Sequence, residues 1–414
     1  MSRDLVSDAR RRIERVRKKG VRILVTRDGQ PVEGALVRLK MKQHQYLFGA
    51  VCYAYGTLKT KRLNERFTEL FTPLLNYTMM PVHWDWYEPK LHQYNEPYIG
   101  NLVDWAEKNG IKRKMHALIW HECCPDWVTP EMDIKALYEE RIADLVTRYK
   151  GRFDFYDLIN ETTVNDRFDN PVSRWVREFG PVNVARFGER AVRAIEPDAK
   201  LIYGDWNVHG REYLDFLRDL RENEVGIDCI GMQSHMHRDL WTQEETLRVM
   251  EEAAKFGWPI HFPEISVCSG KPIGEMSYLK GAVNHFSETE EDLYWQAEFT
   301  KDFYTLVFSH PATEAMSWFD FVDHRWLKAS AGLVTDDLEI KPVYRALMEL
   351  IHKDWHSDAE IRTGTDGTAG SRLFFGEYAL EVEAEGRRTE QVFRLVRPSF
   401  YEGGGEDEII CVAL

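Results

Sequence analysis

Short runs of apolar residues alternate with longer amphipathic segments over most of the chain, from residue 46 to residue 352. Short apolar runs are typical of buried strands, and apolar residues that recur every three or four positions are typical of helices. The strand-like runs are residues 46–51, 77–84, 114–120, 155–161, 201–206, 227–235, 259–266 and 312–319, and helical segments include 101–109, 134–149, 183–195, 244–256 and 341–352. Eight strand–helix units predict an α/β fold, a (β/α)₈ TIM barrel over residues 45–354.

The two ends of the chain do not follow this alternation. The N-terminal extension, residues 1–44, has the pattern of a helix over 2–19 and of strands at 21–26 and 35–40. The C-terminal extension, residues 355–414, has strand-like runs at 372–375, 378–383, 391–396 and 408–413. We expect residues 21–42 and 356–414 to join as one small accessory β layer, with the barrel inserted between them.

Aromatic side chains are the informative feature of the composition. The 414 residues include 13 Trp and 18 Tyr, many beside predicted strand ends, while the apolar fraction of 43% is ordinary for a globular protein. Flat rings at a binding face suit sugars, whose C–H faces pack on them, and filling of the core is the commoner use of such rings.

The charge and hydropathy patterns exclude several classes of partner. A formal net charge of −14 argues against nucleic acid, whose phosphates need a basic surface. No run of 18 apolar residues exists, so no membrane span is expected. The first twenty residues are polar and Arg-rich, which predicts a cytoplasmic protein, or a secreted one from which a signal was removed. The sequence gives no indication of the oligomeric state.

Two carboxylic acids follow predicted barrel strands. Glu161 ends the fourth strand-like run and Glu264 ends the seventh, and strand ends of a barrel meet at one mouth. Hydrolysis of a glycosidic bond needs a proton donor for the leaving oxygen and a carboxylate at the anomeric carbon. We assign Glu161 as general acid/base and Glu264 as nucleophile; a surface salt bridge is the plainer interpretation of a lone strand-end Glu.

The neighbours of the two acids support this assignment. Asn160 can donate a hydrogen bond to a sugar 2-hydroxyl, an interaction that strengthens in the transition state. Gln233 and His235 end the sixth strand-like run, beside the seventh, and can hydrogen-bond Glu264 so that it stays ionised. The proposed acid role requires a raised pKa on Glu161.

These motifs resemble glycoside hydrolase family 10, the retaining β-xylanases on (β/α)₈ barrels, over roughly residues 46–350. The resemblance rests on Tyr156-Asp-Leu-Ile-Asn-Glu161, Gly231-Met-Gln-Ser-His235, His116-Ala-Leu-Ile-Trp120-His121, and Trp318 with Trp326 eight residues on. It implies a retaining hydrolase that cleaves β-1,4-xylosidic bonds in xylan or xylo-oligosaccharides. The sugar-binding residues that it implies are His83, Trp84, His116, Trp120, Asn160, Gln233, His235, Trp318 and Trp326.

The chain departs from the family pattern in places. The second strand of the family usually reads Glu-Asn-x-Met-Lys-Trp, whereas residues 79–84 read Met-Met-Pro-Val-His-Trp. The usual Thr-Glu-Leu-Asp around the nucleophile reads Pro263-Glu-Ile-Ser266. Two further interpretations therefore stay open, a retaining hydrolase of another β-linked glycan or glycoside and a glycan-binding barrel without catalysis. The presence of both glutamates and Asn160 counts against the second.

Cysteine and histidine spacing gives no metal motif. The six cysteines include no Cys-x-x-Cys pair, which predicts free thiols. The histidines that could hold zinc near the mouth are His116, His121, His235 and His237. Because the family resemblance includes no such site, we expect neither a metal nor another cofactor.

Overall fold

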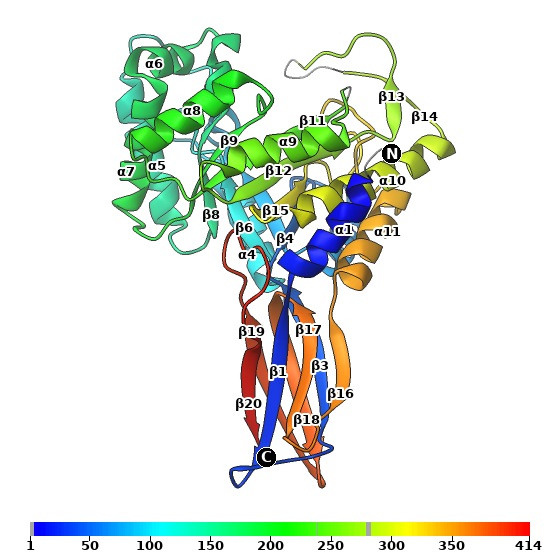
Figure 1. The fold of residues 1–414 in the computed structure, drawn as a ribbon. Coiled ribbons are helices and arrows are strands. Elements are labelled where there is room, and N and C mark those ends of the chain that lie inside the picture. Colours follow the sequence, from blue (N-terminus) through cyan, green and yellow to red (C-terminus); the bar gives the residue numbers. More distant parts are fainter. Residues whose placement is uncertain (1–3, 238, 279–282) are drawn as a thin grey trace. The chain divides into compact units, whose positions relative to one another are not determined.

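The computed structural model describes residues 4–237, 239–278 and 283–414 (Figure 1). Contacts between residues divide the chain into two compact units. The first comprises the residues up to Leu47, Glu298–Glu314 and Arg345–Leu414, and the second comprises Phe48–Ala297 and Ala315–Tyr344. The second unit holds both predicted catalytic acids. No helix of the described residues is long and apolar enough to cross a membrane.

Eight parallel strands of the described chain form a closed ring, which confirms the predicted barrel. Each runs close to its predicted position, and strands such as β9 and β12 are buried along their whole length, as expected where neighbours cover both faces. In ring order the strands are β4 (Leu47–Val51), β5 (Tyr77–Pro81), β6 (Lys112–His116), β8 (Phe155–Asn160), β9 (Leu201–Asp205), β10 (Cys229–Met232), β12 (Ile260–Val267) and β15 (Thr313–Trp318). Short continuations, β7 (Ile119–Trp120) and β11 (Ser234–Met236), extend the ring, and β13 (Gly270–Pro272) pairs with β14 (Phe286–Glu288) outside it.

Helices connect the barrel strands, and polar side chains fix where several of them begin. Thr60, Asp133 and Thr242 each accept a hydrogen bond from a backbone N–H in the first turn, which satisfies a donor that the helix itself cannot pair. The helices after the N-terminal one are α2 (Lys61–Leu74), α3 (Trp84–Tyr87), α4 (Glu96–Lys108), α5 (Ile134–Arg148), α6 (Pro171–Phe179), α7 (Pro181–Arg193), α8 (Arg211–Glu222), α9 (Gln243–Ala254), α10 (Glu290–Ser309) and α11 (Pro342–Glu349).

Strands from both ends of the chain pair with one another in the first unit. The strand β1 (Lys18–Arg27) lies between β17 (Thr368–Phe374), which is antiparallel to it, and β20 (Glu408–Ala413), which is parallel, as Figure 1 shows in blue, orange and red. The strand β3 (Leu36–His44) lies between β16 (Asp358–Arg362) and β18 (Gly376–Ala384) in a separate sheet, completed by β19 (Arg387–Leu395). The two extensions thus join, as predicted, but in two four-stranded sheets rather than one, and β2 (Gln30–Pro31) completes the first of them. The domain boundaries themselves stay a prediction.

The N-terminal helix is shorter than its sequence pattern predicts. The helix α1 (Leu5–Val16) ends three residues before the expected position, and Lys18 already pairs with Phe374 in the sheet. The Arg17 guanidinium is buried and donates to the backbone carbonyls of Phe308 and His310. These contacts join residues about 290 positions apart in the sequence, so no local pattern could place the end of the helix.

Candidate active site

The backbone turns sharply at Glu161, directly after β8. Its φ of +58° lies in the left-handed region, which costs a residue with a Cβ some free energy. The Glu161 N–H donates to the Gly204 carbonyl of β9 at 2.8 Å, so a strand neighbour helps to hold the turn. Such strain is concentrated at functional sites, where it orients a side chain. The Glu161 side chain is buried, with 5% of the residue exposed.

Two side-chain amides hold one oxygen of the Glu161 carboxyl group. Gln233 Nε2 lies 3.1 Å and Asn160 Nδ2 lies 3.3 Å from Glu161 Oε1, and the two amides are themselves 3.3 Å apart. The prediction that Gln233 hydrogen-bonds Glu264 is therefore wrong, because its amide is directed at Glu161. Glu161 Oε2 is buried and has no hydrogen-bond partner among the described residues. A carboxyl group with one bound and one unbound oxygen is oriented for proton transfer at the unbound oxygen.

The surroundings favour the protonated form of Glu161. Burial raises its pKa well above the ordinary value, and the negative charges of Glu122, Glu264 and Asp205 raise it further. The hydrogen bond from Gln233 opposes this shift only in part. Burial penalises the charged form of any carboxyl group, and a nearby like charge adds to the penalty. Glu161 is therefore suited to carry a proton at neutral pH.

Glu264, within β12, has the opposite environment although it is equally buried. His235 Nε2 lies 3.0 Å from Glu264 Oε2, and His116 Nε2 lies 3.9 Å from Oε1. Burial pushes the pKa of Glu264 upward, but the hydrogen bond from His235 and nearby positive charges, among them Lys114, outweigh it, so the pKa lies below its ordinary value. Glu264 is thus the carboxylate that the site keeps ionised.

Two buried charged side chains, Asp157 and Lys114, lie on the side of His116 away from Glu264. Asp157 Oδ2 lies 2.6 Å from His116 Nδ1 and 2.5 Å from Lys114 Nζ, and all three side chains are almost completely buried. Burial alone would raise the pKa of Asp157, but the charges of Lys114 and His116 and their hydrogen bonds bring it below its ordinary value. The ionised Asp157 orients the His116 ring next to Glu264.

Aromatic rings line the sites around the two acids. His83 lies edge-on to Trp120 and His116, with ring centres 5.2 and 5.3 Å apart. Trp326 lies 4.5 Å from His235 and 4.7 Å from His237. Seven of the nine predicted binding residues therefore gather around Glu161 and Glu264: His83, His116, Trp120, Asn160, Gln233, His235 and Trp326. Their contacts with a sugar remain predictions.

Two aromatic rings that were not predicted from the sequence also lie among these residues. Tyr53 lies 6.2 Å from His83 and 6.4 Å from Phe319, and Phe319 lies 4.8 Å from His235. Each follows a barrel strand by one or two residues, as do the residues that were predicted. Their positions just after barrel strands could have identified them, but a single aromatic residue at such a position is equally typical of the hydrophobic core.

Two of the predicted binding residues lie in the protein interior. The Trp84 indole N–H donates to Glu88 at 2.9 Å, and its ring packs 4.7 Å from Tyr138. Trp318 is fully buried, and its indole N–H donates to the Ala331 carbonyl at 2.7 Å. These surroundings favour a structural role for both residues, so their assignment to sugar binding remains a prediction without support from the geometry.

The described residues include no group of three or more His, Cys, Asp or Glu side chains placed to hold a metal ion. The six cysteines are free thiols, and Cys52, Cys123, Cys229 and Cys268 are buried. Burial raises the pKa of Cys52 and Cys268 to about 12, which makes these thiols poor nucleophiles.

Comparison with known proteins agrees with this geometry. A sequence model described as "Glycosyl hydrolase family 10" matches residues 38–350. The chain belongs to glycosyl hydrolase family 10. Among curated relatives, it is 27% identical over 288 residues to endo-1,4-beta-xylanase B of Thermotoga neapolitana, a match that covers 66% of this chain and 79% of the relative. It is 22% identical over 394 residues to endo-1,4-beta-xylanase 1 of Arabidopsis thaliana, which covers 91% of this chain and 38% of that protein.

Solved structures show the same fold. The chain is similar to xylanase 10B of Thermotoga petrophila in complex with xylobiose, with a TM-score of 0.62 and 23% identity over 75% of this chain and 95% of that one. A GH10 endoxylanase from a sugarcane soil metagenome gives a TM-score of 0.63 at 20% identity, over 74% of this chain and 97% of that one. At these identities the likeness establishes the barrel and leaves the substrate to be argued from the site.

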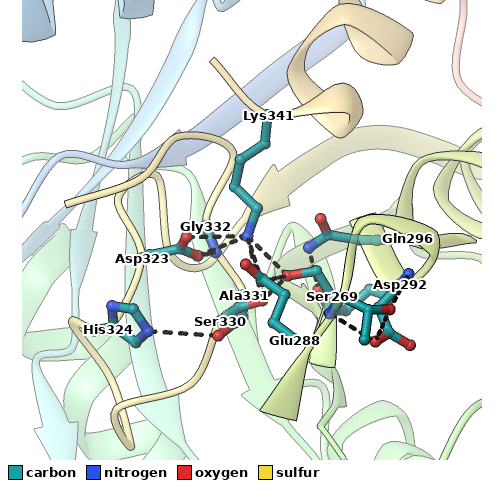
Figure 2. Close-up of polar contacts among 12 residues, drawn as sticks. Ser269, Glu288, Asp292, Gln296, Asp323, His324, Ser330, Ala331, Gly332 and Lys341 are labelled. Atoms are coloured by element: carbon teal, nitrogen blue, oxygen red, sulfur yellow. Dashed lines mark hydrogen bonds and ion pairs between the residues drawn. The ribbon is translucent and has the colours of Figure 1, made fainter. Parts of the chain in front are cut away.

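A buried ammonium group holds the loop that carries Trp326 in this family 10 barrel. Lys341 Nζ lies 2.9 and 3.0 Å from the two Asp323 oxygens and 2.9 Å from Ser269 Oγ (Figure 2). Asp323 Oδ1 also accepts from the Gly332 N–H at 2.6 Å. Ser269 follows β12, the strand of Glu264, whereas Asp323 follows β15. The cluster therefore ties the segment that follows β12 to the loop that carries Trp326.

The raised pKa of Glu161 predicts a pH-dependent cost to stability. The folded protein binds a proton at Glu161 above the ordinary pKa of 4.5, so this stabilising contribution is fully present below pH 4.5 and is lost as pH rises through the folded-state pKa. Glu161→Gln is neutral at every pH. We expect the melting temperature of the variant to exceed that of the wild type increasingly as the pH rises above 4.5. The exposed Glu139→Gln is the matched control, and a pH-independent difference for Glu161→Gln would contradict the assignment.

Removal of the Lys341 charge should destabilise the aromatic loop. Lys341→Met leaves Asp323 buried without its cation, and loss of one partner of a buried pair typically costs about 3–5 kcal/mol. Urea unfolding followed by tryptophan fluorescence measures this loss. Lys328→Met, an exposed change in the same loop, is the control. The double variant Lys341→Met/Asp323→Asn should recover part of the loss; equal stability of Lys341→Met and the control would refute the role of the pair.

Proposed function

We propose that this chain hydrolyses β-1,4-xylosidic bonds in xylan or xylo-oligosaccharides with retention of configuration. The observation that carries the proposal is a pair of buried carboxyl groups whose surroundings favour opposite protonation states, Glu161 protonated and Glu264 ionised. Retaining glycosidases need this combination, a proton donor and a nucleophile. Membership of family 10 and the xylanase names of the relatives support xylan as the substrate.

In the first step, the ionised Glu264 attacks the anomeric carbon while Glu161 gives its proton to the glycosidic oxygen. The bond between the anomeric carbon and that oxygen breaks, the shortened chain leaves as an alcohol, and a glycosyl ester forms on Glu264. The His235 donor at Glu264 Oε2 holds the carboxylate in position for the attack. The unbound Oε2 of Glu161 is the oxygen suited to carry the transferred proton.

In the second step, Glu161 acts as a base, and the charge on Glu264 explains how its role can reverse. The negative charge of Glu264 is one of the causes that raise the pKa of Glu161. Esterification removes that charge, so the pKa of Glu161 falls when the intermediate forms. Glu161 then takes a proton from water, whose oxygen attacks the anomeric carbon and releases Glu264 as a carboxylate.

Sugar recognition beyond the cleavage point differs from the usual family pattern. Met79 and Met80 stand where the family has polar residues, and both side chains are buried. The usual lysine is replaced by His83, whose ring packs against Trp120. Contacts with the next sugar on this side would come from rings rather than from amides and charged groups, so binding there depends on the C–H faces of the sugar.

Substitution of the two acids should give different kinetic signatures. Glu264→Ala removes the nucleophile and should abolish turnover even of an activated aryl β-xyloside. Glu161→Ala should reduce cleavage of unactivated xylo-oligosaccharides by about 10²–10⁴-fold, the usual contribution of acid catalysis, and reduce the first step much less for the activated substrate, which needs no proton. Steady-state and burst kinetics on both substrates measure the difference, and equal losses for Glu161→Ala would refute its acid role.

Azide rescue gives an independent check on which acid has which role. Azide can replace the missing base in Glu161→Ala and attack the glycosyl ester, which yields a β-glycosyl azide with retained configuration. In Glu264→Ala, azide would attack the activated substrate directly and give the inverted α-product. Assignment of the product anomers by NMR tests this expectation, and the reverse pattern would exchange the two roles.

A product profile tests the substrate. We expect reducing ends from xylan and xylo-oligosaccharides, with little release from β-glucan or mannan. Glu264→Ala is the blank for each polymer. Hydrolysis of a different β-glycan without action on xylan would support the altered recognition at Met79, Met80 and His83 as the dominant determinant. Binding of xylan without release of reducing ends would refute hydrolysis.

A further inference from the structure

Two imidazoles flank Glu264, and the groups behind them differ in chemistry. His116 is backed by the carboxylate of Asp157, 2.6 Å from its Nδ1. His235 is backed by the hydroxyl of Ser266, 2.8 Å from its Nδ1. A carboxylate favours a second proton on the ring, whereas a hydroxyl can donate to a neutral ring or accept from a charged one. One imidazole next to Glu264 is therefore held by a charged group and the other by an uncharged one.

The hydrogen-bonding needs of the buried Ser266 hydroxyl indicate which protonation state His235 adopts. Ser266 is 1% exposed, and the described residues offer its hydroxyl no hydrogen-bond partner besides His235. A buried hydroxyl proton needs an acceptor, and Nδ1 is an acceptor only when the ring proton is on Nε2. That Nε2–H then points at Glu264 Oε2, 3.0 Å away, which is an acceptor when ionised. This arrangement satisfies all three groups; a doubly protonated ring would leave the Ser266 proton without a partner.

We propose that Ser266 is a positioning residue that holds His235 as the neutral tautomer with its proton on Nε2, so that Glu264 receives a directed hydrogen bond but no second positive charge. The inference rests on the proposed function only for its kinetic consequence. Its sequence signature is the departure noted above, since the family pattern has Asp where this chain has Ser266. An aspartate there would favour the imidazolium form.

The groups packed around His235 are consistent with this assignment. His237, two residues further along the chain, has a ring 5.9 Å away, and burial lowers the pKa of His237 to about 3, so it adds no positive charge at neutral pH. The rings of Trp326 and Phe319, from the loop after β15, are uncharged. On β12, the groups that contact His235 are Glu264 and Ser266.

A neutral donor has a chemical consequence for the nucleophile. A cation 3.0 Å from Glu264 would stabilise the negative charge of the carboxylate and so reduce its reactivity. This attraction would be lost when the neutral ester forms. A neutral N–H orients the oxygen with a smaller electrostatic penalty to its reactivity. Glu264 would then have two different imidazole neighbours. His116, near Oε1, contacts the charged Asp157, and His235, at Oε2, is neutral.

The decisive measurement is the tautomer of His235 in the full-length protein. Long-range ¹H–¹⁵N NMR distinguishes the Nε2–H form, the Nδ1–H form and the imidazolium, and His235→Gln assigns the signal. At pH 7.5 we expect the Nε2–H form. Ser266→Asp should convert the ring to the imidazolium at the same pH, and Ser266→Ala should give mixed tautomers. Ser234→Ala, a buried hydroxyl next to His235 with no partner among the described residues, is the matched control and should change nothing.

An imidazolium or an Nδ1–H ring in the wild type would overturn the proposal, as would an unchanged tautomer in Ser266→Ala. These outcomes do not depend on turnover, so they stand whether or not xylan is hydrolysed. The kinetic companion is the pH profile of kcat/KM on an activated aryl β-xyloside. Ser266→Ala should lose about two- to tenfold, the value of one hydrogen bond. Ser266→Asp should move the acidic limb of the profile to lower pH, because the His235 imidazolium expected in this variant keeps Glu264 ionised. An acidic limb at the same pH as in the wild type would count against a neutral His235 in the wild type.

Discussion

The site depends on the cost of burying two carboxyl groups close enough to influence each other. Two like charges in a poorly solvated site cannot both persist, so their neighbours must decide which acid keeps its proton. Neutral amides from Asn160 and Gln233 surround Glu161 and supply no charge to stabilise its ionised form. Imidazoles and the buried Lys114 do the opposite for Glu264. The proposed roles of Glu161 as acid and Glu264 as nucleophile rest on this difference in neighbours, because the burial of the two acids is nearly the same.

The scaffold makes that division possible by fixing side chains that come from distant parts of the sequence. Parallel strands buried along their length end together at one mouth, and the left-handed turn at Glu161 aims its carboxyl group there. The aromatic loop after β15 needs its own support, since Trp326 lies outside the regular strands. The Lys341–Asp323 pair supplies it and joins this loop to the segment that follows the nucleophile strand (Figure 2).

The barrel could be predicted from the sequence because it depends on short-range patterns, whereas the roles of Glu161 and Glu264 stay predictions. Continuous apolar runs identify strands, and a polar residue at the end of such a run marks the mouth. What the sequence missed depends on partners far away in the chain. Trp318 is buried because its indole N–H reaches the Ala331 carbonyl, and the first helix stops early because Lys18 pairs with Phe374. Nor could a pattern of residues give the protonation state of Glu161, which depends on charges brought together by folding.

Some departures from the family pattern lie next to Glu264. His83 packs against His116, which contacts Glu264, and Ser266 contacts His235, which contacts the other oxygen. The two side chains that hydrogen-bond Glu161, Asn160 and Gln233, keep the family motif. The side-chain hydrogen bonds of the proposed proton donor are therefore retained, while the surroundings of the proposed nucleophile are altered. Chemistry and specificity can be separated in this way because the two acids lie on different strands, each with its own set of neighbours.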